Sequence, residues 1–131
     1  MIGFENVRKE YPGGTLAVED FTLEIASHEA VALVGTSGSG KTTLMRMINR
    51  MVDPTSGRVT IDGEDVAGMN PVALRRSIGY VMQASGLLPH RTVLDNITTV
   101  PVLRGTAKGE ARERARELKV GGQAVLGRQA L

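Results

Sequence analysis

Residues 35–43 read Gly35, Thr36, Ser37, Gly38, Ser39, Gly40, Lys41, Thr42 and Thr43. They fit the phosphate-binding pattern G-x-x-x-x-G-K-[ST], with Gly35, Gly40, Lys41 and Thr42 at its fixed places. Glycines let the backbone wrap closely around a phosphate, the lysine brings a mobile positive charge, and the Thr42 hydroxyl is placed to ligate Mg²⁺. The alternative is a Gly-rich turn capped by Ser or Thr, and the flanking segments argue against it.

Those flanks predict a strand before the loop and a helix after it. Residues 30–34, Ala-Val-Ala-Leu-Val, form a short continuous apolar run, which is typical of a buried parallel strand. Residues 41–52 place apolar side chains at helical spacing, so one face of the helix is expected to pack on a sheet. The loop would then lead into a helix N-terminus, where unpaired N–H groups and the helix dipole favour an anion.

Composition excludes several classes of protein. A chain of 131 residues is long enough for one domain with a core, which buries roughly two thirds of its unfolded surface. The formal net charge is only +2, so nucleic acid is not a predicted partner. There is no Cys, hence no disulfide framework. The chain shows neither a signal peptide nor an apolar run long enough to cross a bilayer, so any membrane role is expected to depend on a partner.

The rest of the chain predicts a mostly parallel α/β core with an antiparallel hairpin in front of it. Asn70 and Thr92 are expected to be helix N-caps, and residues 106–118 an amphipathic helix with a charged face. Two expected strands, 2–11 and 16–25, form the hairpin. A third, 58–62, is expected to be half exposed, and a fourth, 78–82, to be buried. The tail from Gly121 has no firm periodicity and no predicted structure.

Several side chains near these elements allow two interpretations. Gln83 follows the 78–82 strand, at the same sheet edge as the loop. In one interpretation its amide coordinates Mg²⁺ or orients a water, and in the other it is simply a polar residue at a strand end. Tyr11 either stacks on an adenine ring or closes its strand, and the residues alone favour the second interpretation. Leu87 and Leu88 are either an exposed docking patch or buried loop anchors. His90 lacks ligand-type neighbours and is not a predicted metal ligand.

The order of these features resembles the ATP-binding subunit of ABC transporters. The resemblance spans residues 2–103 and rests on Tyr11, the 35–43 loop, Pro54-Thr55-Ser56-Gly57, Asp62-Gly63 and Gln83. It implies an α/β P-loop NTPase fold in truncated form: an antiparallel β-subdomain, the first part of the RecA-like core and the start of a helical subdomain. Residues 1–103 would be the N-terminal part of the ATP-binding domain. Residues 104–131 would be a charged helix and an atypical tail.

The resemblance also implies roles for individual residues and two cofactors, ATP and Mg²⁺. Tyr11 would be the aromatic residue that stacks on adenine, and residues 35–43 the Walker A motif that holds the phosphates. Gln83 would be the Q-loop glutamine, which contacts Mg²⁺ together with Thr42 and links the nucleotide to the membrane subunits. The implied partners are transmembrane permease subunits and a second ATP-binding subunit, which would place the chain at the cytoplasmic face of the membrane.

Residues 44–50 and 93–101 are similar to the osmoprotectant branch of these importers, which handles glycine betaine, choline or proline betaine. The sequence departs from the family further on. It carries no recognisable Walker B strand, catalytic glutamate or switch histidine, and Gly121-Gly122-Gln123 follows Lys119-Val120 where the family signature has Leu-Ser. The chain alone is therefore expected to bind ATP without hydrolysing it. The alternative is a truncated nucleotide-binding or interaction module, while the hairpin and the Gln83 region argue against a small kinase.

Overall fold

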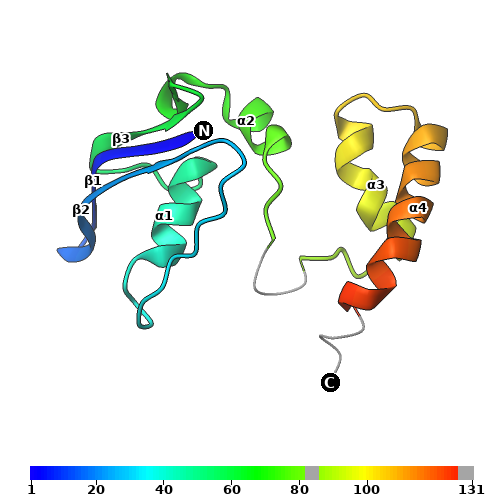
Figure 1. Cartoon of the computed structure of the whole chain (residues 1–131), viewed down its shortest axis with the longest axis horizontal. Coiled ribbons are helices and arrows are strands. Elements are labelled where there is room, and N and C mark those ends of the chain that lie inside the picture. The colour runs from blue at the N-terminus through cyan, green and yellow to red at the C-terminus, as the bar shows by residue number, and fades with distance from the viewer. Residues whose placement is uncertain (82–85, 127–131) are drawn as a thin grey trace. The chain divides into compact units, whose positions relative to one another are not determined.

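The computed structural model describes residues 1–81 and 86–126, and side chains as far as Leu118 (Figure 1). It divides into two compact units, Met1–Gly79 and Tyr80–Leu131. Each unit is described by itself. The division into residues 1–103 and 104–131 rests on the family resemblance and stays a prediction.

The first unit is built on a four-stranded antiparallel sheet. Its strands are β1 (Ile2–Tyr11), β2 (Thr15–Ile25), β3 (Ser56–Ile61) and the short β4 (Glu64–Asp65), in the spatial order β2-β1-β3-β4. The predicted hairpin is confirmed: the amide of Gly14 donates to the Tyr11 carbonyl at 3.1 Å, and Ile2 lies opposite Ile25. The expected strand at 58–62 is also present, as β3, which pairs with β1.

Helix α1 (Lys41–Ile48) follows the loop and is shorter than the 41–52 helix predicted. Arg50 adopts a left-handed φ of 53°, and its amide bonds to the Met47 carbonyl at 3.1 Å. The next amide, that of Met51, bonds back to the Arg46 carbonyl at 2.9 Å. This pair of bonds is a Schellman motif, which ends a helix by satisfying its last carbonyls. Met51 therefore leaves the apolar face and is 54% exposed.

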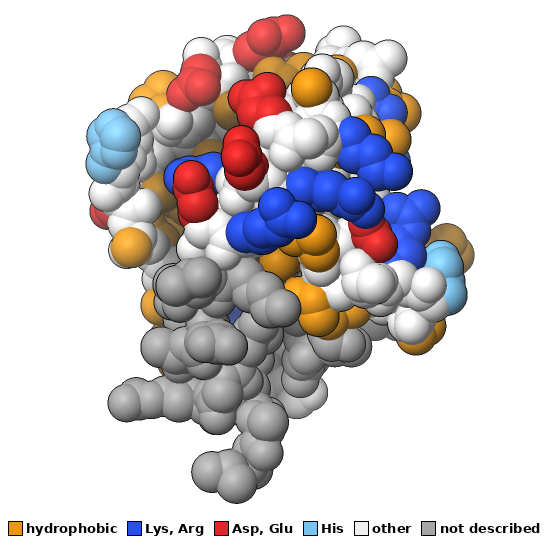
Figure 2. Space-filling model, turned by 90° about the vertical axis from the view of Figure 1, so that its right-hand side faces the viewer, with side chains coloured by type: hydrophobic (Ala, Val, Ile, Leu, Met, Phe, Trp, Pro, Cys, Tyr) orange, Lys and Arg blue, Asp and Glu red, His pale blue; other side chains and the backbone are white. Residues whose placement is uncertain are grey.

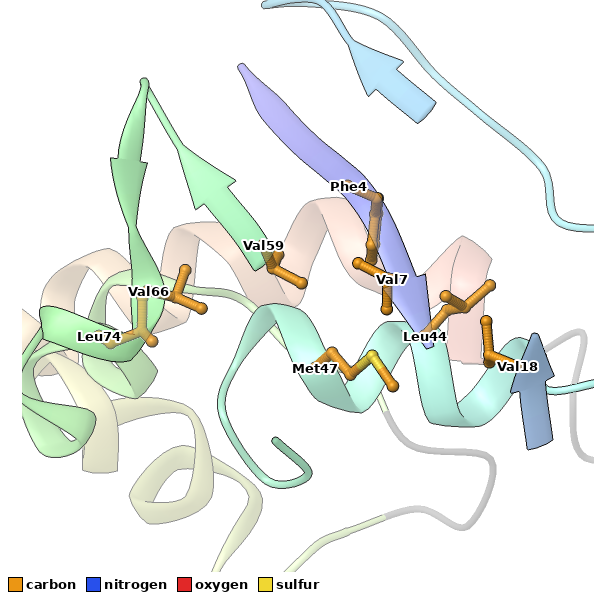
Figure 3. Close-up of a cluster of buried hydrophobic side chains, with 8 residues drawn as sticks. All are labelled: Phe4, Val7, Val18, Leu44, Met47, Val59, Val66 and Leu74. Carbon is orange, nitrogen blue, oxygen red and sulfur yellow. The ribbon is translucent and has the colours of Figure 1, made fainter. Parts of the chain in front are cut away.

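The core of the first unit lies between the sheet and α1 (Figure 3). The predicted apolar face of α1 supplies Leu44 and Met47, and Met47 is fully buried. Burying such a side chain contributes about 1.5–3 kcal/mol relative to leaving it exposed. The other core residues come from the strands, the 3₁₀ turn η1 (Val66–Gly68) and helix α2 (Pro71–Ser77): Phe4, Val7, Val18, Val59, Val66 and Leu74.

Helix α2 begins and packs as its sequence suggests. The Asn70 side-chain oxygen accepts hydrogen bonds from the amides of Val72 and Ala73 at 3.0 and 3.1 Å, which confirms the predicted N-cap. Near the end of α2, the Arg75 guanidinium donates to the Asn49 carbonyl at 3.0 Å. A cation is favourable at that point because the last carbonyls of α1 carry partial negative charge.

The two predicted parallel strands are not formed. Residues 30–34 have no strand geometry, and Val34 is 93% exposed. Residues 78–81 are also irregular, with Val81 92% exposed, and Met82 lies outside the described residues. A parallel strand is stabilised by hydrogen bonds to neighbouring strands, and the one sheet in the described ranges contains only β1 to β4. The predictions of strands at 30–34 and 78–82 are therefore wrong for the residues that the structure describes.

The second unit contains a helical hairpin, α3 (Val93–Leu103) and α4 (Lys108–Leu126). Thr92 is the N-cap of α3, as predicted, because its hydroxyl accepts from the Asp95 amide at 3.1 Å. Within α4, Ala111 and Ala115 are buried, whereas Leu118 of the same predicted face is 53% exposed. Helix α4 continues to Leu126, into the stretch from Gly121 for which the sequence predicted no structure. None of the helices in the described residues has the length and apolarity to cross a membrane.

Candidate phosphate-binding site

The loop that ends at α1 is organised around the ammonium group of Lys41. Its Nζ donates hydrogen bonds to the Gly35 carbonyl at 2.8 Å, the Thr36 carbonyl at 2.6 Å and the Ser39 hydroxyl at 3.0 Å. An ammonium has three donors, so the loop's own oxygens satisfy all of them. The exposed loop residues place these acceptors close to water. A phosphate can therefore replace them as the partner of the lysine without opening a buried contact.

The backbone of the loop requires glycine at Gly40. This residue is the N-cap of α1 and has a left-handed φ of 82°. A Cβ placed on it would lie 2.4 Å from the Ala17 carbonyl oxygen, which belongs to the backbone of β2. Strand β2 thus touches the residue that starts α1. Gly38 also has a left-handed φ, 84°, but a Cβ there would meet nothing within 4 Å.

The first turn of α1 is suited to an anion. The N-cap residue, Gly40, makes no side-chain hydrogen bond to the first amides of α1, and the first turn contains no acidic residue. The N–H groups of the first turn have no partners within the helix and carry partial positive charge, which favours phosphate or carboxylate. Thr42 is exposed in this turn, so its hydroxyl can reach a cation bound to that anion. Mg²⁺ commonly takes one or two protein oxygens and completes its shell with water and substrate phosphates.

Tyr11 lies beside this turn. Its hydroxyl is 3.4 Å from the Thr43 hydroxyl, although the two residues are 32 positions apart in the sequence. The Lys9 ammonium lies 5.1 Å from the centroid of the Tyr11 ring and donates to the Asp53 carbonyl at 2.7 Å. The structure thus brings Tyr11 to the helix that begins at the loop.

Gln83, the remaining predicted site residue, lies outside the described residues. Within residues 1–81 and 86–126, no group of three or more His, Cys, Asp or Glu side chains could hold a metal ion. His90 is exposed in a turn.

Comparison with known proteins identifies the family. The profile of the ABC transporter family matches residues 18–128. The chain belongs to the ABC transporter family. Its members are ATPases that bind ATP with Mg²⁺. This ABC chain shares 50% identity over 118 residues with the carnitine transport ATP-binding protein OpuCA of Listeria monocytogenes, covering 90% of this chain and 30% of the relative.

Two further proteins agree with this assignment. The glycine betaine/carnitine/choline transport ATP-binding protein OpuCA of Bacillus subtilis is 50% identical over 90% of this chain and 31% of its own length. Among solved structures, the dimeric ATP-binding cassette MJ0796 bound to ADP and Pi has a TM-score of 0.79 and 31% identity, covering 89% of this chain and 55% of that chain. The ABC chain thus has the fold of the N-terminal part of a cassette, and spans about a third of the curated transport proteins.

A second polar feature of the ABC chain lies in its helical hairpin. A pocket of about 630 Å³ there is lined by four basic side chains, His90, Arg91, Lys108 and Arg112, with Asp95 as the acid among them. Lys and Arg side chains gather on the face of the molecule seen in Figure 2. Leu87 and Leu88 precede the hairpin and are 54% and 39% exposed, so they are not buried loop anchors.

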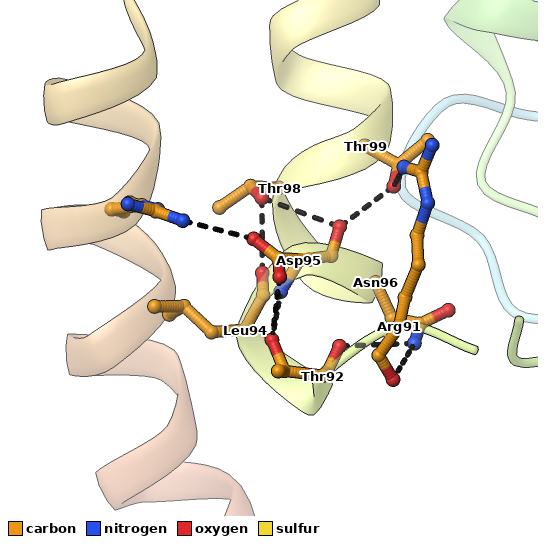
Figure 4. A network of polar contacts seen from close by, with 8 residues as sticks. Arg91, Thr92, Leu94, Asp95, Asn96, Thr98 and Thr99 are labelled. Carbon is orange, nitrogen blue, oxygen red and sulfur yellow. Dashed lines mark hydrogen bonds and ion pairs between the residues drawn. The ribbon is translucent and has the colours of Figure 1, made fainter. Parts of the chain in front are cut away.

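Asp95 is the centre of a polar network in this hairpin (Figure 4). Its carboxylate accepts from the Thr92 hydroxyl at 2.8 Å and from the Arg112 guanidinium of α4 at 3.1 Å. Both groups favour the ionised form, first Thr92 and then Arg112, and they hold the pKa of the Asp95 carboxyl below its usual value. Sequence inspection missed the Arg112 contact, because 17 residues separate the partners and no helical spacing relates them.

We expect Asp95→Asn to flatten the acid dependence of the hairpin. A carboxyl whose pKa is lowered by folding stabilises the folded form above its unfolded pKa of about 3.9, and this contribution is lost as the pH falls through the lower folded value. In wild type, helical circular dichroism should therefore decline in that acidic range, and less steeply in the variant. Glu113→Gln, on an exposed position of α4, is the matched control. Identical profiles for wild type and Asp95→Asn would contradict the assignment.

Proposed function

We propose that this chain binds MgATP through residues 35–43 and Tyr11, as part of the ATP-binding subunit of an osmoprotectant importer. The observation that carries the proposal is the Lys41 ammonium held by the loop's own oxygens at the uncapped start of α1. The same three donors fit phosphate oxygens, and charge-assisted hydrogen bonds of this kind are about twice as strong as neutral ones. Membership of the ABC transporter family supports the same conclusion.

Each candidate residue has a role in this proposal. Lys41 exchanges its hydrogen bonds within the loop for hydrogen bonds to the β- and γ-phosphates. The backbone amides of the loop surround these phosphates: those of Thr36, Ser37, Gly38, Ser39, Gly40, Lys41, Thr42 and Thr43. Thr42 and Gln83 are the proposed ligands of Mg²⁺, which supplies positive charge at the phosphates when bound. Tyr11 packs against the adenine. These roles come from the pattern of the residues and from the position of Tyr11 near Thr43.

The substrate class and the partners come from relatives. Three similar transport proteins are named for carnitine, choline and glycine betaine, all quaternary amines. We propose the same class of cargo for the system that this chain serves. Its proposed partners are transmembrane permease subunits and a second ATP-binding subunit, and the dimeric cassette of similar fold supports the latter. Such an assembly would hold the chain at the cytoplasmic face of the membrane.

Binding without turnover is the second part of the proposal. Hydrolysis needs a positioned water and a group that orients it or accepts its proton, besides charge stabilisation at the phosphates. The recognisable parts of this chain, the loop and Gln83, are the parts that bind. We therefore expect no Mg-ATPase activity of the purified chain above that of a Lys41→Ala control. Turnover that depends on Lys41 would overturn this expectation and favour a complete catalytic site.

A titration with a fluorescent ATP analogue and Mg²⁺ tests the binding proposal. Saturable binding that unlabelled ATP displaces, and that weakens when Mg²⁺ is chelated, is the expected result. A chain that binds no analogue while retaining its helical circular dichroism would overturn the proposal. The remaining reading would then be an interaction module without a nucleotide.

We expect Tyr11→Ala to weaken ATP binding by roughly fivefold or more. Stacking of a base on an aromatic ring contributes about 1–3 kcal/mol, and 1.4 kcal/mol is a tenfold change in Kd. Tyr11→Phe keeps the ring and loses only the contact with the Thr43 hydroxyl, so it should bind nearly as well as wild type. Inorganic tripolyphosphate has no base, and its affinity should be unchanged by Tyr11→Ala. Equal losses for both ligands would mean that Tyr11 supports the loop instead of the adenine.

A further inference from the structure

The helical hairpin of the second unit contains a pocket that the proposed ATP site does not use. Its volume is about 630 Å³, which is typical of sites for small organic molecules. The lining comes from residues 90–112, which all belong to the second unit. Part of it is a stripe of α3 at helical spacing, formed by Asp95, Thr98, Thr99 and Val102. The pocket can therefore be analysed as a feature of the hairpin.

The charged side chains of this pocket are mostly positive. Arg91 precedes α3, whereas Lys108 and Arg112 are four residues apart on one face of α4. Asp95 is the one acidic side chain among the lining residues that the structure describes, and Arg112 pairs with it at 3.1 Å. One carboxylate thus faces three cations, which leaves two positive charges without a counterpart in this lining. A ligand with two negative charges would neutralise them.

The two arginines offer hydrogen-bond donors to such a ligand. Arg91 donates to the Thr99 hydroxyl at 3.1 Å, which holds its guanidinium beside α3 (Figure 4). A guanidinium has five donors, so this bond leaves most of them for other partners. The Nε atom of Arg112 is buried and has no hydrogen-bond partner within the part of the chain that the structure describes. A buried donor of this kind is destabilising until a ligand or a water satisfies it.

The pocket also has an apolar part, formed by Val102 and Leu103 in the last turn of α3. These side chains are 40% and 54% exposed. Val102 lies about one helical turn beyond Thr99, to which the Arg91 guanidinium is bonded, so cationic and apolar groups are neighbours here. A bare inorganic ion would leave the apolar part without a contact. A ligand that joins a charged group to a small carbon group would fit both parts.

We propose that this pocket binds a small phosphate monoester. Its phosphate contacts Arg91, Lys108 and Arg112, and its carbon part lies against Val102 and Leu103. A monoester is a dianion above its second pKa of about 6, so it supplies the two negative charges that the lining calls for. Guanidinium groups also match the geometry of phosphate oxygens, because their planar donors bind two oxygens at once. The inference does not depend on ATP binding at residues 35–43.

The experiment titrates the full chain with phenyl phosphate, without nucleotide, and follows the backbone amide signals by two-dimensional NMR. We expect saturable shifts at residues 90–112. Inorganic phosphate lacks the carbon group and benzoate carries one charge, so both should bind at least about threefold more weakly. Shifts confined to residues 35–43, or no saturation at 90–112 by about 10 mM phenyl phosphate, would overturn the inference. Equal affinities for phenyl phosphate and benzoate would also overturn it.

Variants make the test specific to the pocket. Arg91→Ala and Lys108→Ala should each weaken phenyl phosphate binding about three- to tenfold, because the ligand is doubly charged and the site is partly exposed to water. Arg116→Ala removes an equal charge from an exposed position of α4 outside the lining, and should have less than about a twofold effect. Lys41→Ala should leave the shifts at 90–112 unchanged. Equal losses for Lys108→Ala and Arg116→Ala, in chains with wild-type helical circular dichroism, would assign the binding to diffuse charge and overturn the inference.

Discussion

Lys41→Ala is expected to lower the affinity of the chain for MgATP by roughly ten- to a hundredfold. Hydrogen bonds that involve a charged group contribute about 1.5–3 kcal/mol, which corresponds to that range of Kd. In the structure the ammonium already lies within the loop, bonded to the carbonyls of Gly35 and Thr36. Removing it takes away the one side-chain cation of the phosphate-binding pattern. Titration with the fluorescent ATP analogue measures the effect.

The control for this variant separates binding from folding. The loop oxygens that Lys41 contacts belong to exposed residues, so water can replace the lysine and the thermal midpoint should change little. Lys108→Ala removes an equal charge from α4 and should leave the affinity for ATP as in wild type. If Lys41→Ala bound the analogue as tightly as wild type, the loop would not be a phosphate site.

Gly40→Ala should destabilise the first unit by about 1–3 kcal/mol more than Gly38→Ala does. Both glycines have left-handed φ angles, 82° and 84°, so both alanines incur a similar backbone strain of roughly 1–2 kcal/mol. Only at Gly40 would the new Cβ lie 2.4 Å from the Ala17 carbonyl oxygen. Relieving that contact must move β2 away from the start of α1, and overpacking of this kind costs typically 1–3 kcal/mol. Urea unfolding of the full chain measures the difference.

The paired design isolates the contact from the strain. Equal urea midpoints for the two variants would show that the contact between Gly40 and β2 does not affect the free energy of unfolding. We also expect Gly40→Ala to reduce analogue binding more than Gly38→Ala, because the first turn of α1 supplies the phosphate-binding amides. A Gly40→Ala chain that unfolds earlier but binds normally would place the anion site elsewhere in the loop.

Local signals predicted the helix starts and the hairpin well. Asn70 and Thr92 cap helices α2 and α3 through bonds to amides two or three residues on, and such short-range chemistry can be recognised in the sequence. The end of α1 was predicted less well. Helical periodicity continued to residue 52, but the left-handed Arg50 stopped the helix at Ile48. An Arg gives no sequence signal for that conformation, whereas a Gly would have done so.

The strand predictions failed for a different reason. The 30–34 segment has the composition of a buried strand, but pairing depends on a neighbour that composition cannot supply. Gln83 was a prediction in a stretch outside the described residues, so its role stays a proposal. Arg112 was missed because its partner, Asp95, lies on another helix.

The sequence by itself determined the chemistry of the 35–43 loop and the helix that follows it. Those properties depend on residue types at fixed short spacing and on the backbone freedom of glycine. Only the tertiary structure decided that Tyr11 lies 3.4 Å from Thr43 and that Gly40 starts α1 against Ala17. It also decided that Val34 is exposed. Contacts and burial of this kind depend on how distant segments pack, which no local pattern encodes.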